Sequence, residues 1–199
     1  LSYDEERRLL AACQGERVIP YTRKRIGREE DLTMTVKLDN PRLKAIIMIA
    51  IDTGMRKGEI LKLKWDDIHF EERFISIPRE NTKTESPRIV PLTERCKQEL
   101  ELIRSFTKGD TVFPIAHFSR SWNTAKKLAK IDNLRFHDLR RTAVSRWQED
   151  YGMSLGLAAK VAGHETESIT SRHYTVVDRD TVRALADRID VGQGGDFIN

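Results

Sequence analysis

Cysteine and long apolar runs are scarce in this sequence. Its 199 residues include two cysteines, Cys13 and Cys96, which are too far apart to suggest a disulfide framework or a zinc-binding pattern. The longest apolar run, around Ala45 to Ile51, is far too short to cross a bilayer. No basic segment followed by an apolar one opens the chain, so we expect no export signal and a reducing, cytoplasmic setting.

The charge of the chain is mildly positive overall but unevenly distributed. The formal net charge is +4, whereas the segment from Ser119 to Trp147 holds eight Lys or Arg against two Asp, a local charge of +6 that leaves −2 for the rest. A basic segment on an otherwise slightly acidic protein indicates a polyanionic partner, and nucleic acid is the usual one. Taken alone, such a run is more often a solvated helix face.

The spacing of apolar residues predicts a mainly α fold with a small three-stranded antiparallel β-sheet (α+β). A helix begins at Asn40-Pro41, a good cap and first-turn pair, and ends at Gly54. Two short apolar runs, 74–77 and 89–92, then flank a polar turn and predict the sheet. Helical patterns fill the rest, marked by Thr93–Ile103, Trp122–Leu128, Leu139–Trp147, Leu155–Ala162 and Val182–Ile189.

The two ends and one internal stretch differ from this pattern. Ser2 and Glu5 form a capping-box pattern, so a helix should begin almost at the first residue. Residues 14–40 are charged and irregular, and we expect a long loop or small insertion with short extended pieces near Val18 and Met34. Residues 1–190 are expected to form one domain, and the Gly-rich residues 191–199 a flexible tail.

Four short segments carry side chains suited to phosphate chemistry. They are Thr53–Ile60, Asn81–Thr84, His137–Thr142, and Ala162–His164 followed ten residues later by Tyr174. Each has an ordinary structural explanation when taken singly. An Arg after a helix-ending Gly is commonly a terminal charge, a Lys at a hairpin tip is a solvated turn residue, and a Tyr is most often a core aromatic.

Their order along the chain is more specific than any one of them. It runs Arg56, Lys83, His137, Arg140, His164 and Tyr174. This order resembles the tyrosine recombinases, the phage integrase family, over nearly the whole chain to about Ile189. The family usually has Leu where Ile60 and Ala162 stand here, and both replacements are apolar. The resemblance implies the catalytic-domain fold of DNA breaking-rejoining enzymes, with these six side chains as catalytic residues.

The implied chemistry agrees with what a phosphodiester needs. No convincing carboxylate cluster offers a metal site, and arginine forks can neutralise the phosphate instead. The resemblance makes Arg56 and Arg140 that clamp, and it makes His137 and His164 further donors that could also assist proton transfer. Glu59, three residues after Arg56, is expected to orient the guanidinium or a neighbouring backbone group.

Tyr174 would be the nucleophile and Lys83 the acid. A free phenol has a pKa near about 10, and two nearby guanidinium groups favour its phenolate. Attack would give a 3′-phosphotyrosine and a 5′-alkoxide that Lys83 protonates. The phosphotyrosine keeps the bond energy, so rejoining would need no metal, other cofactor or ATP.

The resemblance also implies partners. They are double-stranded DNA and further copies of the chain on it, as a tetramer in the full-length synaptic complex, within an integrating mobile element or phage. Arg120, Lys126 and Lys127 are expected to meet the DNA backbone. The family normally adds an amino-terminal helical domain that closes a clamp around DNA. This domain is absent from the chain, so we expect weak DNA binding by the isolated chain.

Two other functions compete with site-specific recombination. A type IB topoisomerase uses closely related Arg, Lys, His and Tyr chemistry, and an inactive DNA-binding relative would keep the fold alone. In recombinases the carboxy-terminal segment docks onto a neighbouring protomer, and the apolar stripe of the last helix could serve this purpose. The same stripe fits equally well on its own domain. Every catalytic position is filled, which weighs against an inactive relative.

Overall fold

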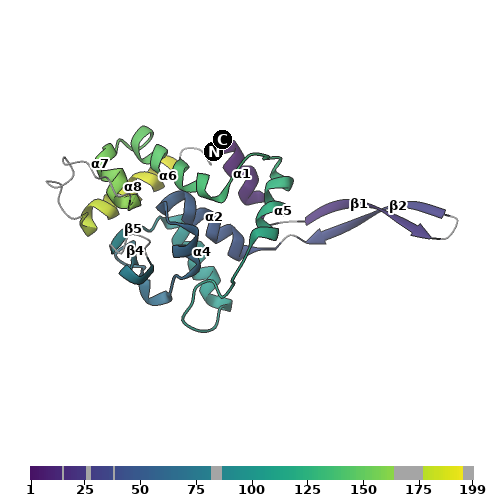
Figure 1. Ribbon diagram of the computed structural model, residues 1–199, viewed down its shortest axis with the longest axis horizontal. Coiled ribbons are helices and arrows are strands. Elements are labelled where there is room, and N and C mark those ends of the chain that lie inside the picture. Colours follow the sequence, from purple (N-terminus) through teal and green to yellow (C-terminus); the bar gives the residue numbers. More distant parts are fainter. Residues whose placement is uncertain (15, 26–27, 38, 82–86, 164–176, 195–199) are drawn as a thin grey trace.

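A helical body with a projecting two-stranded arm makes up the computed structural model (Figure 1). The structure describes residues 1–199 except 15, 26–27, 38, 82–86, 164–176 and 195–199. The helices are α1 (Tyr3–Ala11), α2 (Pro41–Thr53), α3 (Lys57–Leu61), α4 (Glu94–Phe106), α5 (Ser119–Ala129), α6 (Phe136–Glu149), α7 (Leu155–Ala162) and α8 (Arg179–Gly194). The strands are β1 (Glu16–Arg25), β2 (Arg28–Lys37), β3 (Ile68–His69), β4 (Phe74–Ile77) and β5 (Arg88–Pro91).

Helix α2 lies at the centre of the body. Asn40 caps it through Oδ1, which accepts the Leu43 N–H at 3.0 Å, and Pro41 occupies the first turn. Its residues from Ala45 to Thr53 are buried because α4 packs on one side and α6 on another. Gly54 ends the helix in the left-handed conformation, with φ of 62°. The predicted helix is therefore confirmed at both ends.

The three-stranded sheet is confirmed, in the order β3-β4-β5 with antiparallel neighbours. Ile75 pairs with Val90, and both side chains are fully buried. Helices α7 and α8 contact β5, and α8 also contacts β4, so the end of the chain covers this sheet. The sheet thereby connects the middle of the sequence to its carboxy-terminal helices.

Residues 14–40 differ from the expected loop. They form β1 and β2, a regular antiparallel pair of ten residues each, with Glu16 opposite Lys37 and Arg25 opposite Arg28. This two-stranded ribbon extends away from the helical body (Figure 1). The expected extended segments near Val18 and Met34 are present, but the strands are longer than expected. Charged, polar and apolar residues are mixed along these strands, so the sequence shows no clear strand period. The strands are stabilised by pairing with each other.

Two helix boundaries also differ from the sequence-based ones. The residues after Gly54 predict a short helix over roughly Lys57 to Lys64, but α3 ends at Leu61 and the chain then forms a short 3₁₀ helix at Trp65–Asp67. Helix α8 runs to Gly194, so its last turn includes part of the expected tail. The apolar stripe on α8 packs on its own domain, since Val182, Leu185, Ala186 and Ile189 are at most 2% exposed.

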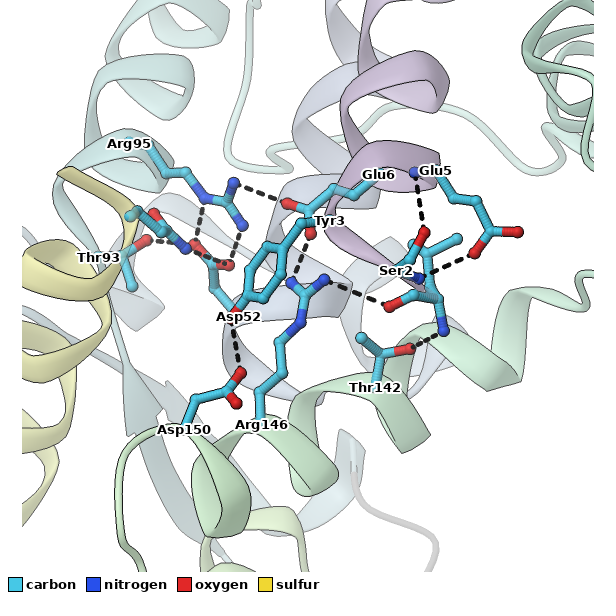
Figure 2. Close-up of polar contacts among 12 residues, drawn as sticks. Ser2, Tyr3, Glu5, Glu6, Asp52, Thr93, Arg95, Thr142, Arg146 and Asp150 are labelled. Carbon is cyan, nitrogen blue, oxygen red and sulfur yellow. Dashed lines mark hydrogen bonds and ion pairs between the residues drawn. The ribbon is translucent and has the colours of Figure 1, made fainter. Parts of the chain in front are cut away.

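A network of buried ion pairs and hydrogen bonds joins five helices (Figure 2). Arg95 of α4 donates to both oxygens of Asp52 in α2 and pairs with Glu6 of α1. Glu6 also accepts from Arg146 of α6, and Gln193 of α8 donates to Asp52 at 3.3 Å. Burial raises the pKa of Asp52, but the Arg95 guanidinium lowers it by more, so the pKa lies below its usual value. This network connects α2, which ends just before Arg56, with α6, which carries Arg140.

Cys13 and Cys96 are buried free thiols. Among the described residues, no helix is both long enough and apolar enough to cross a membrane.

Candidate active site

Arg56 is placed at the start of α3 by the sharp end of α2. Gly54 turns the chain in a conformation that a side chain would strain, and an added Cβ would also meet Cη2 of Trp147 at 2.9 Å. Arg56 then precedes α3 in extended conformation, and its side chain is 25% exposed. Its Nη1 donates to Glu59 Oε1 at 3.0 Å and its Nη2 to the Gly163 carbonyl at 2.9 Å. Two fixed acceptors therefore orient the guanidinium.

The Glu59 carboxylate is saturated by hydrogen bonds. Oε1 accepts from Arg56 Nη1 and Arg88 Nη1, both at 3.0 Å. Oε2 accepts the Arg56 backbone N–H at 2.8 Å and Arg88 Nη2 at 2.7 Å. Burial raises the pKa of Glu59, but Arg88 and then Arg56 lower it below its usual value. Glu59 contacts both groups suggested from the sequence, the Arg56 guanidinium and a backbone N–H.

Arg88 was missed in the sequence. The sequence pattern places Arg88 in the polar turn after β4, whereas it opens β5 and its side chain is 8% exposed. Besides Glu59, it contacts the end of α7, where Nε donates to the Val161 carbonyl at 3.1 Å. The available signal was an arginine at the start of an apolar run, too weak to separate from an ordinary turn residue.

Arg140 lies in α6 and contacts the turn at Gly54. Its Nη1 donates to the Gly54 carbonyl at 2.6 Å, and the residue is 3% exposed. Its Nη2 is buried and has no hydrogen-bond partner among the described residues. Burial, then the charges of Arg56 and Arg88, lower the pKa of Arg140 to about 10, while Glu59 raises it. The guanidinium is still charged at neutral pH, and a buried N–H is available to an anion.

The structure brings Arg56, Glu59 and Arg140 into one cluster. His137 is the second residue of α6 and has an exposed side chain, three residues before Arg140. Lys83, His164 and Tyr174 lie outside the described residues. The described chain ends at Gly163 on one side of that gap, and the Gly163 carbonyl is held by Arg56.

The basic segment 119–147 is not one surface. Arg140 and Arg146 are buried, and Arg146 pairs with Glu6. Arg120 and Lys127 are exposed on α5, whereas Lys126 is half-buried near the Trp122 ring. The charge run therefore divides into a structural part, an active-site part and an exposed part.

The structure also contains a cavity away from this cluster. It is a cavity of about 960 Å³ bounded by α1, α2, α4 and α8, with Leu10, Met48 and Arg95 in its wall. Of the predicted site residues that the structure describes, none lines this cavity. Within the described residues, no group of three or more His, Cys, Asp or Glu side chains could hold a metal ion.

Known proteins similar to this chain are recombinases and integrases. Over 146 residues it is 30% identical to the shufflon-specific DNA recombinase of Escherichia coli, covering 73% of this chain and 38% of that protein. It is 32% identical to the tyrosine recombinase XerA of Saccharolobus solfataricus, covering 70% of this chain and 47% of the relative. The chain thus spans at most about half the length of the first curated relatives it matches.

Solved structures share the fold. The catalytic domain of bacteriophage HP1 integrase superimposes with a TM-score of 0.59 at 24% identity, covering 87% of this chain and 84% of that domain. A XerA recombinase gives a TM-score of 0.62 at 23% identity, covering 88% and 60%. The model of the phage integrase family matches residues 28–180, which include the arginine cluster. The chain therefore belongs to the phage integrase family, the tyrosine recombinases.

Proposed function

We propose that this chain is the catalytic part of a site-specific DNA recombinase that cleaves and rejoins DNA through Tyr174. The observation that carries the proposal is the buried, unpartnered Nη2 of Arg140 beside a second oriented guanidinium, Arg56. A buried donor without an acceptor is costly, and an anion bound there removes the cost. For a member of this family, that anion would be a phosphodiester of the bound DNA.

In this proposal, two described arginines bind the phosphate. Arg140 would donate Nη2–H to one non-bridging oxygen, and Arg56 would donate its remaining N–H groups to the other. The Gly54 and Gly163 carbonyls and Glu59 hold both guanidinium groups in place before DNA arrives. Little reorganisation is then required when the pentavalent phosphorane forms, and this preorganisation is the main source of rate acceleration at such sites.

Tyr174 and Lys83, which would carry out the covalent steps, lie outside the described residues, as does His164, whereas His137 lies in α6. The Tyr174 phenolate would attack the phosphorus, forming a 3′-phosphotyrosine bond and breaking the bond to the 5′ oxygen. Lys83 would give that oxygen its proton, and His137 and His164 would donate to the phosphate oxygens or move protons. Reversal by a 5′-hydroxyl restores the DNA, and no metal or nucleotide cofactor enters the balance.

We further infer double-stranded DNA as the substrate and a tetramer on DNA as the assembly, with the chain in the cytoplasm. Structures of related fold include the Tn1549 transposon integrase with circular intermediate DNA and XerH bound to its difH substrate. Arg120, Lys126 and Lys127 are proposed backbone contacts. Replacing Arg120 and Lys127 with Ala should each lower the salt slope of DNA binding by about 1.

A suicide substrate tests the reaction. Incubating the chain with nicked duplex DNA that carries its recombination site should give a covalent adduct on a denaturing gel. Tyr174→Phe should abolish the adduct, whereas Tyr151→Phe and a chelator should leave it unchanged. An adduct lost on chelation, or retained by Tyr174→Phe, would contradict the proposal. Relaxation of supercoils at arbitrary sequence would instead favour the topoisomerase alternative, and DNA binding without any adduct the inactive relative.

A further inference from the structure

Two guanidinium groups share one carboxylate beside the phosphate site. Glu59, whose side chain is 2% exposed, accepts one side-chain bond from Arg56 and two from Arg88. A carboxylate paired with Arg56 alone would cancel the charge that a phosphate must meet. With Arg88 also present, the three groups carry one net positive charge.

We propose that Arg88 is a positioning residue that neutralises Glu59 and so leaves the charge of Arg56 available to the DNA phosphate. The inference rests on the proposed function and concerns a residue to which that function gives no role. Arg88 is suited to this task because its side chain is 8% exposed and makes a paired, two-bond contact with Glu59. Because the Arg88–Glu59 pair is shielded from water, its charges are weakly screened and act strongly on the neighbouring Arg56.

Arg88 also fixes the end of α7. Its Nε donates to the Val161 carbonyl, and Arg56 donates to the Gly163 carbonyl two residues later. A Cβ on Gly163 would lie 3.0 Å from Cδ, Cζ and Nε of Arg88, so the two elements are in close contact. Since His164 follows Gly163 and Lys83 lies five residues before Arg88, one side chain connects three segments of the proposed site.

A charge-balance experiment separates this role from simple packing. Arg88→Met removes the charge and hydrogen bonds but keeps an unbranched side chain, and it leaves Glu59 as a buried carboxylate held by Arg56 alone. We expect the single-turnover cleavage rate on the suicide substrate at saturating DNA to fall about 100-fold. The dissociation constant for DNA should change by less than about threefold, because most phosphate contacts lie elsewhere.

The second-site variant gives the decisive comparison. In Arg88→Met, Glu59→Gln, the uncompensated charge is gone, so the rate should recover about tenfold relative to Arg88→Met. Damage to packing alone predicts the opposite, since two buried changes would reduce the rate further. Arg88→Lys keeps the charge without the fork and should retain a rate within about tenfold of wild type.

The outcomes distinguish the two proposals. A wild-type chain that forms no adduct overturns both. A wild-type adduct with an unchanged rate in Arg88→Met, or with no recovery in the double variant, overturns the role of Arg88 alone. Thermal unfolding of each variant, followed by circular dichroism, identifies the temperature at which all four chains are folded, and the rates are compared there.

Discussion

The Arg140 guanidinium donates to the Gly54 carbonyl at 2.6 Å, across 86 positions of sequence. Because this carbonyl belongs to the residue that ends α2, the backbone turn that places Arg56 also orients Arg140. The two arginines of the proposed clamp are thus adjusted together. A change in the turn should affect both.

Gly54→Ala tests this coupling. The substitution puts a Cβ at φ of 62° and 2.9 Å from Trp147 Cη2, so it combines backbone strain with a clash. We expect the free energy of unfolding in urea to fall by about 2 to 4 kcal/mol. Gly152→Ala is the matched control, with φ of 67° and open space around the Cβ, and should cost about 1 kcal/mol. Equal losses for the two variants would contradict the close approach at Gly54.

Arg140→Lys should impair cleavage more than folding. Lysine keeps a positive charge but cannot donate to the Gly54 carbonyl and to a phosphate oxygen from one rigid fork. We expect the rate of adduct formation to fall about 100-fold or more. Arg141→Lys, at a neighbouring side chain that is 78% exposed, should stay near the wild-type rate. Similar rates for both variants would remove Arg140 from the clamp.

Asp52→Asn should destabilise the helical body. The wild-type carboxylate is fully buried and pairs with Arg95, and losing one partner of a buried pair costs about 3 to 5 kcal/mol. Its pKa in the fold is below the ordinary 3.8, so its stabilising contribution is complete above that pH and is lost as the pH falls below it. The wild-type and variant unfolding free energies should therefore converge in acid. A constant difference down to pH 2, or an equal loss in exposed Asp132→Asn, would count against this account.

Leu185→Ala tests whether α8 is part of its own domain. Leu185 is 2% exposed, and α8 is further held by Arg73, which pairs with Asp187 at 2.6 Å and with Asp190. We expect a loss of about 2 to 5 kcal/mol in chemical unfolding of the monomer. Val191→Ala, on the same helix but 79% exposed, should change little. If Leu185→Ala left stability unchanged and only weakened self-association, α8 would be an intermolecular element.

Local rules predicted much of the fold. The Asn40 cap, the Gly54 helix end and the Ser2–Glu5 capping box depend on neighbouring residues alone, and all three were located in the sequence. Arg56, Glu59 and Arg140 were identifiable because their motifs have fixed spacing. Their convergence depends on α2 packing against α6, which sequence spacing does not encode.

Long-range pairing determined what could not be predicted. Arg88 looks like a turn residue until Glu59, 29 positions away, is known to face it. Arg146 reads as part of a basic surface, whereas it is buried against Glu6, 140 positions away. The ten-residue strands β1 and β2 depend on partners across the hairpin rather than on a clear apolar period. In each case a side chain acquires its role from a distant element.

The ribbon of β1 and β2 leaves and re-enters the body at almost one point, because the Asn40 N–H donates to the Cys13 carbonyl at 2.9 Å. The first and last residues of the excursion are therefore neighbours whatever lies between them. Lengthening, shortening or exchanging the ribbon would leave the path of every helix unaltered. The distance to which the ribbon extends and the stability of the helical body can therefore change independently of each other.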